Sequence, residues 1–189
     1  MTWRTNLFDV KLAVNDKYRF NGVDKGDSWK RSIEGFFVGR CPQIAAMLNW
    51  AEKKGTEVIT MQMCDEAFNN GEFDSEQHGV LEENHKVLAS HVWSFLQICC
   101  VDGAATVFQG CMPNLNGLEV WRAMTWEINA GRGSRLGALQ EFVAKPPPVR
   151  RYQDISSAIT TFDCKLQDLA EAGGERFTKR AKEMPLHPR

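Results

Sequence analysis

Three histidines lie close together in the chain: His78, His85 and His91, at intervals of seven and six residues. On a helix, His78 and His85 would share a face, and His91 would lie about a turn and a half beyond them. A zinc site needs closer ligands, as in the Cys-x-x-Cys and His-Glu-x-x-His patterns, and the chain has neither. We therefore expect solvated or core-edge histidines and predict no metal site.

The cysteines and the paired acids are the other groups whose types suit catalysis. A cysteine nucleophile needs a base held near it in space, and nothing local to the six irregularly spaced cysteines supplies one. Asp65-Glu66 and Glu82-Glu83 are neighbouring acids on expected helix surfaces, which does not establish acid–base chemistry. The sequence predicts no catalytic residue and no cofactor. Reduced, buried thiols in a cytoplasmic protein are the expected state.

Basic residues near the C-terminus offer a different chemistry, the neutralisation of RNA phosphates. The candidate RNA contacts are Arg150, Arg151, Arg176, Lys179 and Arg180. The same residues also make an ordinary solvated surface, and no motif of a known nucleic-acid module accompanies them. The glycines of GRGSRLG follow no strand and do not form a phosphate loop.

Charge is divided unevenly along the 189 residues. The net charge of the whole chain is -1, but residues 1–131 carry -5 and residues 132–189 carry +4. Charge runs are most often solvated faces, and head-to-tail association of copies is the alternative interpretation. Hydrophobic residues make up 43% of the chain, yet no run approaches the roughly 20 apolar residues of a membrane span. The N-terminal residues lack the apolar core of a signal peptide, so no membrane partner is predicted.

Apolar spacing predicts helices almost throughout, after a loop or extended segment over 6–27. Trp29, Ile33, Phe36 and Phe37 mark one helical face, with Asp27 or Ser28 as its cap. A long helix capped by Ser75 has the richest apolar face and is predicted to be the central one. The remaining expected helices cover about 42–54, 57–68, 104–111, 118–130, 134–145 and 155–172.

Residues 117–173 combine several signals in a fixed order. A helix with Trp121 and Trp126 precedes a glycine break at 131–133, and a leucine helix then ends at three prolines, 146–148. An amphipathic helix follows, with Ile155, Ile159, Phe162, Leu166 and Leu169 at alternating spacings of four and three. The order suggests two helical parts joined near residue 131.

These segments resemble the Gag capsid region of copia-type LTR retrotransposons. The family shows a G-x-E-x-W-R-x-L-like helix, a leucine helix ending in proline and an amphipathic helix ending near a glycine. It also has an upstream F-x-G … W … F segment. The matching residues here are Gly117, Glu119, Trp121 and Arg122, then Leu136, Leu139 and Pro146, then Ile155, Phe162, Leu166 and Gly173, and upstream Phe20, Gly22, Trp29 and Phe36.

The resemblance implies an all-α, two-lobed capsid-like fold that self-assembles into virus-like particles around the RNA of the element. It implies an N-terminal arm at 1–17, an N-terminal lobe at 18–131 and a C-terminal lobe at 132–189. The glycines at 131–133 would link the lobes. Trp29 and Trp121 would be core residues, and Arg122 would pair with an acid on a neighbouring helix. The family's zinc knuckle is absent, and a truncated C-terminal lobe is one expectation.

A homo-oligomer of this kind works through its interfaces. Trp3, Phe8 and Phe20 are candidates to dock on a neighbouring copy, with packing on their own lobe as the alternative. Ile155, Ile159, Phe162 and Leu166 could pair across a two-fold axis or belong to the core. The first hypothesis is therefore a non-enzymatic structural Gag capsid protein. The second is a monomeric or dimeric helical adaptor that binds a protein or nucleic acid, and the third is an enzyme with an unrecognised helical site.

Overall fold

The computed structural model describes residues 10–23, 25–77, 79, 81, 84–112 and 115–171. The chain forms two compact units, Met1–Ala130 and Gly131–Arg189, called unit 1 and unit 2 below. The boundary between them differs by one residue from the boundary that the sequence predicts. Residues 10–17, expected to form a separate arm, are part of unit 1.

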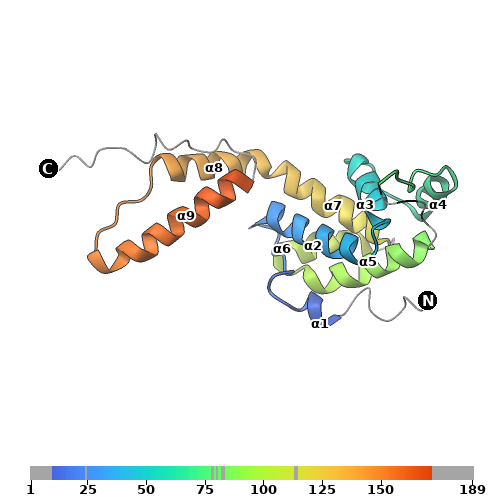
Figure 1. Cartoon of the computed structure of the whole chain (residues 1–189), viewed down its shortest axis with the longest axis horizontal. Coiled ribbons are helices and arrows are strands. Elements are labelled where there is room, and N and C mark those ends of the chain that lie inside the picture. Colours follow the sequence, from blue (N-terminus) through green and yellow to red (C-terminus); the bar gives the residue numbers. More distant parts are fainter. Residues whose placement is uncertain are drawn as a thin grey trace. The chain divides into compact units, whose positions relative to one another are not determined.

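Both units are helical, which confirms the all-α class (Figure 1). The described residues contain no β-strand, only isolated bridges that join Phe20 to Cys100 and Ser75 to Gly79. Unit 1 contains α1 (Val10–Ala13), α2 (Gly26–Arg40), α3 (Ile44–Lys53), α4 (Met61–Asn69), α5 (His85–Cys99), α6 (Asp102–Gly110) and α7 (Gly117–Ala130). Unit 2 contains α8 (Arg132–Ala144), the short 3-10 helix η3 (Tyr152–Asp154) and α9 (Ile155–Glu171).

Capping side chains set where α4 and α5 begin. The Thr60 hydroxyl accepts a hydrogen bond from the Met63 amide at 3.2 Å, so the β-branched residues before it stay outside α4. The Asn84 side chain accepts from the Lys86 amide at 2.9 Å and starts α5. The predicted cap at Ser75 is wrong, because Ser75 exchanges backbone hydrogen bonds with Gly79 in a turn.

Three further predictions about local structure need correction. The segment 6–27 was expected to be loop or extended chain, but α1 forms within it and buries Ala13 against α5. The helical run is interrupted at Gly131, one of the three predicted break residues, and the predicted cap at Ser134 is wrong. Gly131 has an α-helical φ of -77°, and α8 begins at Arg132 without a Ser134 cap. Likewise, α2 begins at Gly26, ahead of both predicted caps.

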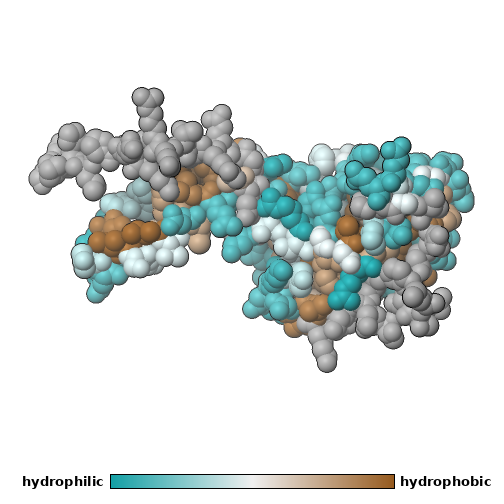
Figure 2. All heavy atoms as spheres, in the orientation of Figure 1, coloured by the Kyte–Doolittle hydropathy of each residue, from teal (hydrophilic) through white to brown (hydrophobic). Residues whose placement is uncertain are grey.

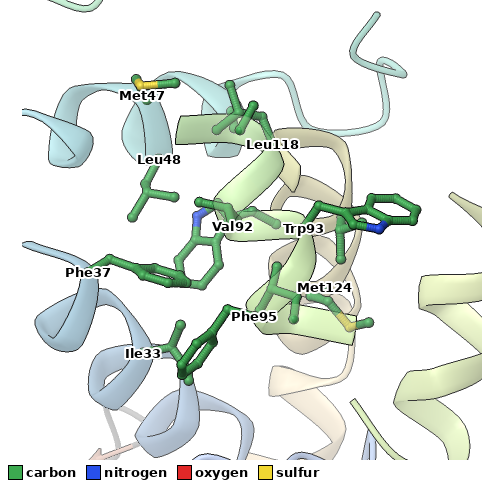
Figure 3. Close-up of a cluster of buried hydrophobic side chains, with 14 of the residues drawn as sticks. Ile33, Phe37, Met47, Leu48, Val92, Trp93, Phe95, Leu118 and Met124 are labelled. Atoms are coloured by element: carbon green, nitrogen blue, oxygen red, sulfur yellow. The ribbon is translucent and has the colours of Figure 1, made fainter. Parts of the chain in front are cut away.

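The central helix of unit 1 is α7, although the sequence favoured the segment that contains α5. Every residue from Gly117 to Thr125 is buried, so the N-terminal two turns of α7 are surrounded on all sides. Helices α3, α5 and α6 pack directly on it. Figure 3 shows side chains from four helices converging in this core: Ile33, Phe37, Met47, Leu48, Val92, Trp93, Phe95, Leu118 and Met124.

Gly117 brings α7 very close to α5. A Cβ atom at this position would overlap the carbonyl oxygen of Ala89 and the backbone nitrogen of Trp93. The two helix backbones therefore approach each other at a distance that only glycine permits. This contact gives a physical reason for the glycine that opens the Gly-x-Glu-x-Trp-Arg motif.

Replacing Gly117 by alanine should force α5 and α7 apart. We expect Gly117→Ala to destabilise unit 1 by about 1–3 kcal/mol, the usual cost of overpacking a core. Urea unfolding followed by tryptophan fluorescence and circular dichroism measures this change. Gly35→Ala, inside helix α2, is the matched control. Apart from the backbone of α2 itself and the adjacent residues, no atom lies within 4 Å of the added Cβ. This variant should be neutral or stabilising by up to about 1 kcal/mol, and equal losses for both variants would contradict the close approach.

Unit 2 is a helical hairpin in which α9 returns alongside α8 (Figure 1). The connection contains the three prolines, which lack backbone donors and end α8 as predicted. Among the described residues of unit 2, only Val143 and Leu169 are buried. The hairpin therefore has very little core of its own.

No helix in the described ranges combines the length and the apolar character that crossing a membrane would need.

Candidate functional site

Among the described residues that first suggested chemistry, most of the cysteines are buried, and His85 and Asp65 contact each other. Five cysteines are buried, and only Cys164 is exposed. Burial raises the pKa of Cys99 to about 12 and that of Cys111 to about 11, so both thiols stay protonated at neutral pH. Burial also raises the pKa of Cys100, with a smaller effect from Cys99. These thiols pack as small apolar side chains.

The contacts of His85 are those of a packing residue. Its ring stacks on Phe68 with centroids 4.6 Å apart, and its Nε2 lies 2.7 Å from an Asp65 carboxylate oxygen. Hydrogen bonds from Lys86 and then His85 hold the pKa of Asp65 below its usual value. The described residues include no group of three or more side chains placed to hold a metal ion. His78 lies outside the described residues.

Glu119 and Arg122 form a buried ion pair in unit 1. Arg122 donates to both Glu119 oxygens, at 2.8 and 2.6 Å, and to the Gly55 carbonyl at 2.6 Å. Glu119 also accepts from the Ile59 amide at 2.7 Å. The hydrogen bonds to Glu119 hold the pKa of Arg122 above the ordinary value. The prediction that Arg122 pairs with a neighbouring helix is wrong, because its acid lies one turn earlier on α7.

The tryptophans of the motifs are buried anchors with satisfied indoles. Trp121 is fully buried, and its indole donates to Glu52 at 3.0 Å. The other Glu52 oxygen accepts from Lys30 at 2.6 Å. Trp29 donates to the Tyr18 carbonyl at 2.7 Å. These bonds connect α7 and α2 to the segments around them, so both tryptophans have a structural role.

The structure places Phe20 in the core and not on an interface. Its ring is 4% exposed and stacks on Trp29 with centroids 4.7 Å apart. Its backbone amide donates to the Cys99 carbonyl, which fixes the segment before α2. The candidate interface role of Phe20 is therefore wrong, and the alternative of packing on its own unit holds. Trp3 and Phe8 lie outside the described residues.

An open apolar groove of about 810 Å³ lies within unit 2, between the end of α8, the proline segment and the first half of α9. We call it the α8–α9 groove. The apolar residues that line it include Phe142, Pro147, Val149, Ile155, Ile159 and Phe162. Figure 2 shows hydrophobic surface over this hairpin. Phe142 and the prolines also line the groove, and the apolar spacing of α9 alone does not predict that they do.

The groove gathers three of the four predicted interface residues of α9. Ile155 is 40% exposed and Ile159 is 57% exposed, while Phe162 is half-buried. Leu166 is half-buried outside the groove lining, and Leu169 packs into the hairpin. The stripe therefore divides into a core end, near Leu169, and an exposed end, near Ile155.

Two of the candidate RNA contacts belong to the same site. Arg150 and Arg151 are exposed and line the α8–α9 groove, together with Asp154. The other three, Arg176, Lys179 and Arg180, lie outside the described residues. The groove thus combines an apolar floor with charged groups at its edge, an arrangement suited to binding a macromolecular surface.

Comparison with known proteins adds no further constraint: no family model, no curated protein and no solved structure matches the chain.

The buried ion pair should be essential for the stability of unit 1. Arg122→Met leaves the Glu119 carboxylate buried without its cation, and we expect a loss of about 3–5 kcal/mol. Glu119→Leu combined with Arg122→Met removes both charges and should lose less than Arg122→Met alone. Chemical unfolding of unit 1 measures both changes.

A matched control removes an exposed ion pair from the same unit. The Arg19 guanidinium lies 3.7 Å from an Asp16 carboxylate oxygen; the Arg19 side chain is half exposed and that of Asp16 is almost fully exposed. Arg19→Met should therefore change the free energy of unfolding by less than about 1 kcal/mol. Similar stabilities of the Arg19→Met and Arg122→Met variants would contradict the role given to the buried pair.

Proposed function

We propose that the chain is a non-enzymatic structural protein that self-assembles, of the type found in the Gag capsid region of copia-type retrotransposons. The observation that carries this proposal is the exposed apolar lining of the α8–α9 groove. In this proposal, unit 1 is the rigid body and unit 2 supplies contacts between copies.

The small core of unit 2 supports an assembly role. Two helices with only Val143 and Leu169 buried among the described residues remove little apolar surface from water. Units with so small a core commonly gain stability from a metal, disulfides or association with another chain. Association through Ile155 and Ile159 would bury the side chains that the hairpin leaves exposed.

The environment of the titratable groups supports a structural role over catalysis. The buried thiols have raised pKa values, and the buried Glu119–Arg122 pair has its hydrogen bonds within the core. The carboxylate of Glu34 has a raised pKa because of burial first and of Glu52 second, but Lys30 opposes the shift. Each of these effects is explained by packing inside unit 1.

RNA packaging is the second part of the proposal. Arg150 and Arg151 are the candidate RNA contacts that lie among the described residues, and both are exposed at the groove. Such contacts would be independent of RNA sequence and would weaken as salt increases.

A charge in the groove floor should prevent self-association. Ile159→Asp places a carboxylate among apolar side chains that an interface would bury, so the concentration needed for association should rise at least tenfold. Size-exclusion chromatography with light scattering, over a range of protein concentrations, measures the mass of the particles. Circular dichroism checks that the helices remain, as expected for a side chain that is already mostly exposed.

Val14→Asp is the matched control, because Val14 is 51% exposed in unit 1 and does not line the groove. It should associate as the unmodified chain does. An Ile159→Asp variant that associates normally would contradict the role of the groove. A chain that is monomeric at every concentration would contradict self-assembly and favour the adaptor hypothesis.

A further inference from the structure

The charged residues that line the α8–α9 groove carry a small net positive charge, from Arg150 and Arg151 against Asp154. Residues 145–151 contain Lys145, Arg150 and Arg151 and no acid. Both arginines line the groove, and Asp154 is the acid that lines it with them. An apolar floor with a basic edge is best complemented by a surface that presents an apolar side chain among carboxylates.

Unit 1 has a surface of that kind on α4 and the turn after it. The α4 acidic surface, as we call it, consists of Glu66, Phe68, Glu72, Asp74 and Glu76, all exposed. No lysine or arginine occurs between Lys54 and Lys86. Phe68 supplies the apolar side chain, with its ring supported from behind by stacking on His85.

Backbone hydrogen bonds hold this surface in one compact turn. The amide of Asn70 donates to the Glu66 carbonyl at 3.0 Å, and the amide of Glu72 donates to the Ala67 carbonyl at 2.9 Å. Gly71 permits the turn by adopting a φ of +71°. The surface is therefore preorganised, and little conformational entropy would be lost when it binds.

Three of these carboxylates accept hydrogen bonds from neutral donors. Glu72 accepts from the Trp50 indole at 2.9 Å, and Asp74 accepts from the Leu81 amide at 3.0 Å. Glu66 accepts from the Gln62 side-chain amide at 2.9 Å. Asp65 differs, because Lys86 lies 2.9 Å from it and balances its charge.

We propose that the α8–α9 groove of one copy binds the α4 acidic surface of the next copy, so that the chains associate head to tail. The exposed part of Phe68 would contact Ile159 at the groove, and the carboxylates would face Arg150 and Arg151, which in this contact would bind protein carboxylates instead of RNA phosphates. The inference rests on the proposed self-assembly and names the surface that the groove receives.

Charge favours this arrangement over a two-fold pairing of grooves. A two-fold interface uses the same patch on both copies, so the basic edges of two grooves would share one interface. Like charges brought together in this way oppose association. A head-to-tail contact joins opposite charges. In a pair of chains it leaves one groove and one α4 acidic surface unoccupied, so the contact can be repeated to form a ring or an extended filament.

Charge reversal on each surface separately provides the test. Variant A carries Arg150→Glu and Arg151→Glu in the groove, and variant B carries Glu66→Lys and Glu76→Lys on the α4 acidic surface. Each variant alone should need at least a tenfold higher concentration to associate, because A has two acidic surfaces and B has lost the net negative charge of its α4 surface. Sedimentation velocity across concentrations, at about 50 mM and about 500 mM salt, measures association and its screening.

An equimolar mixture of A and B should associate again. The basic groove of B then meets the unchanged acidic α4 surface of A, and the acidic groove of A meets an α4 surface of B that carries two lysines and no net negative charge. Combining all four substitutions in one chain should likewise restore self-association. Glu127→Lys with Glu141→Lys is the control, because it changes the net charge as B does at two exposed positions outside both surfaces.

The possible results separate this inference from the proposed function. If B associates as the unmodified chain does, or if mixing A with B restores nothing, the head-to-tail contact is wrong and self-assembly stands. If the unmodified chain stays monomeric at both salt concentrations, the proposed function fails and this contact fails with it.

Discussion

The organisation of unit 1 depends on one buried ion pair. Burying a carboxylate and a guanidinium is costly unless their hydrogen bonds are satisfied. Here Arg122 joins Glu119 to the Gly55 carbonyl, and Glu119 takes the Ile59 amide. The connection between α3 and α4 is thereby fixed to α7, the helix around which the other helices pack. The same connection determines where α4 begins and so supports the surface that α4 presents.

Stability and exposed apolar surface are distributed unequally between the two units. Unit 1 contains nearly all of the buried apolar side chains and several indole hydrogen bonds. Unit 2 keeps Ile155 and Ile159 exposed beside two arginines. One unit is thus sufficient as a scaffold, whereas the other gains most from contact with a second molecule. This division of roles is the physical basis for proposing a protein that acts through its interfaces.

Much of the helical architecture could be predicted from apolar spacing, because a 3.6-residue period reports which face is buried. Trp29, Ile33 and Phe37 lie on one buried face of α2, as their spacing indicates. Long-range geometry could not be predicted in the same way. Whether Phe20 meets Trp29 or a partner depends on how a loop folds back, and the close approach at Gly117 depends on the position of α5. The groove was partly predictable, since Ile155 and Ile159 belong to the apolar spacing of α9. Phe142 and the prolines line it only because α8 and α9 pack together as a hairpin.

Self-assembly is tested most directly by negative-stain electron microscopy of the concentrated, unmodified chain at low and high salt. Rings, tubes or closed particles of uniform width, more abundant at low salt, are the predicted result. Fields of separate particles of monomer size under every condition would contradict self-assembly.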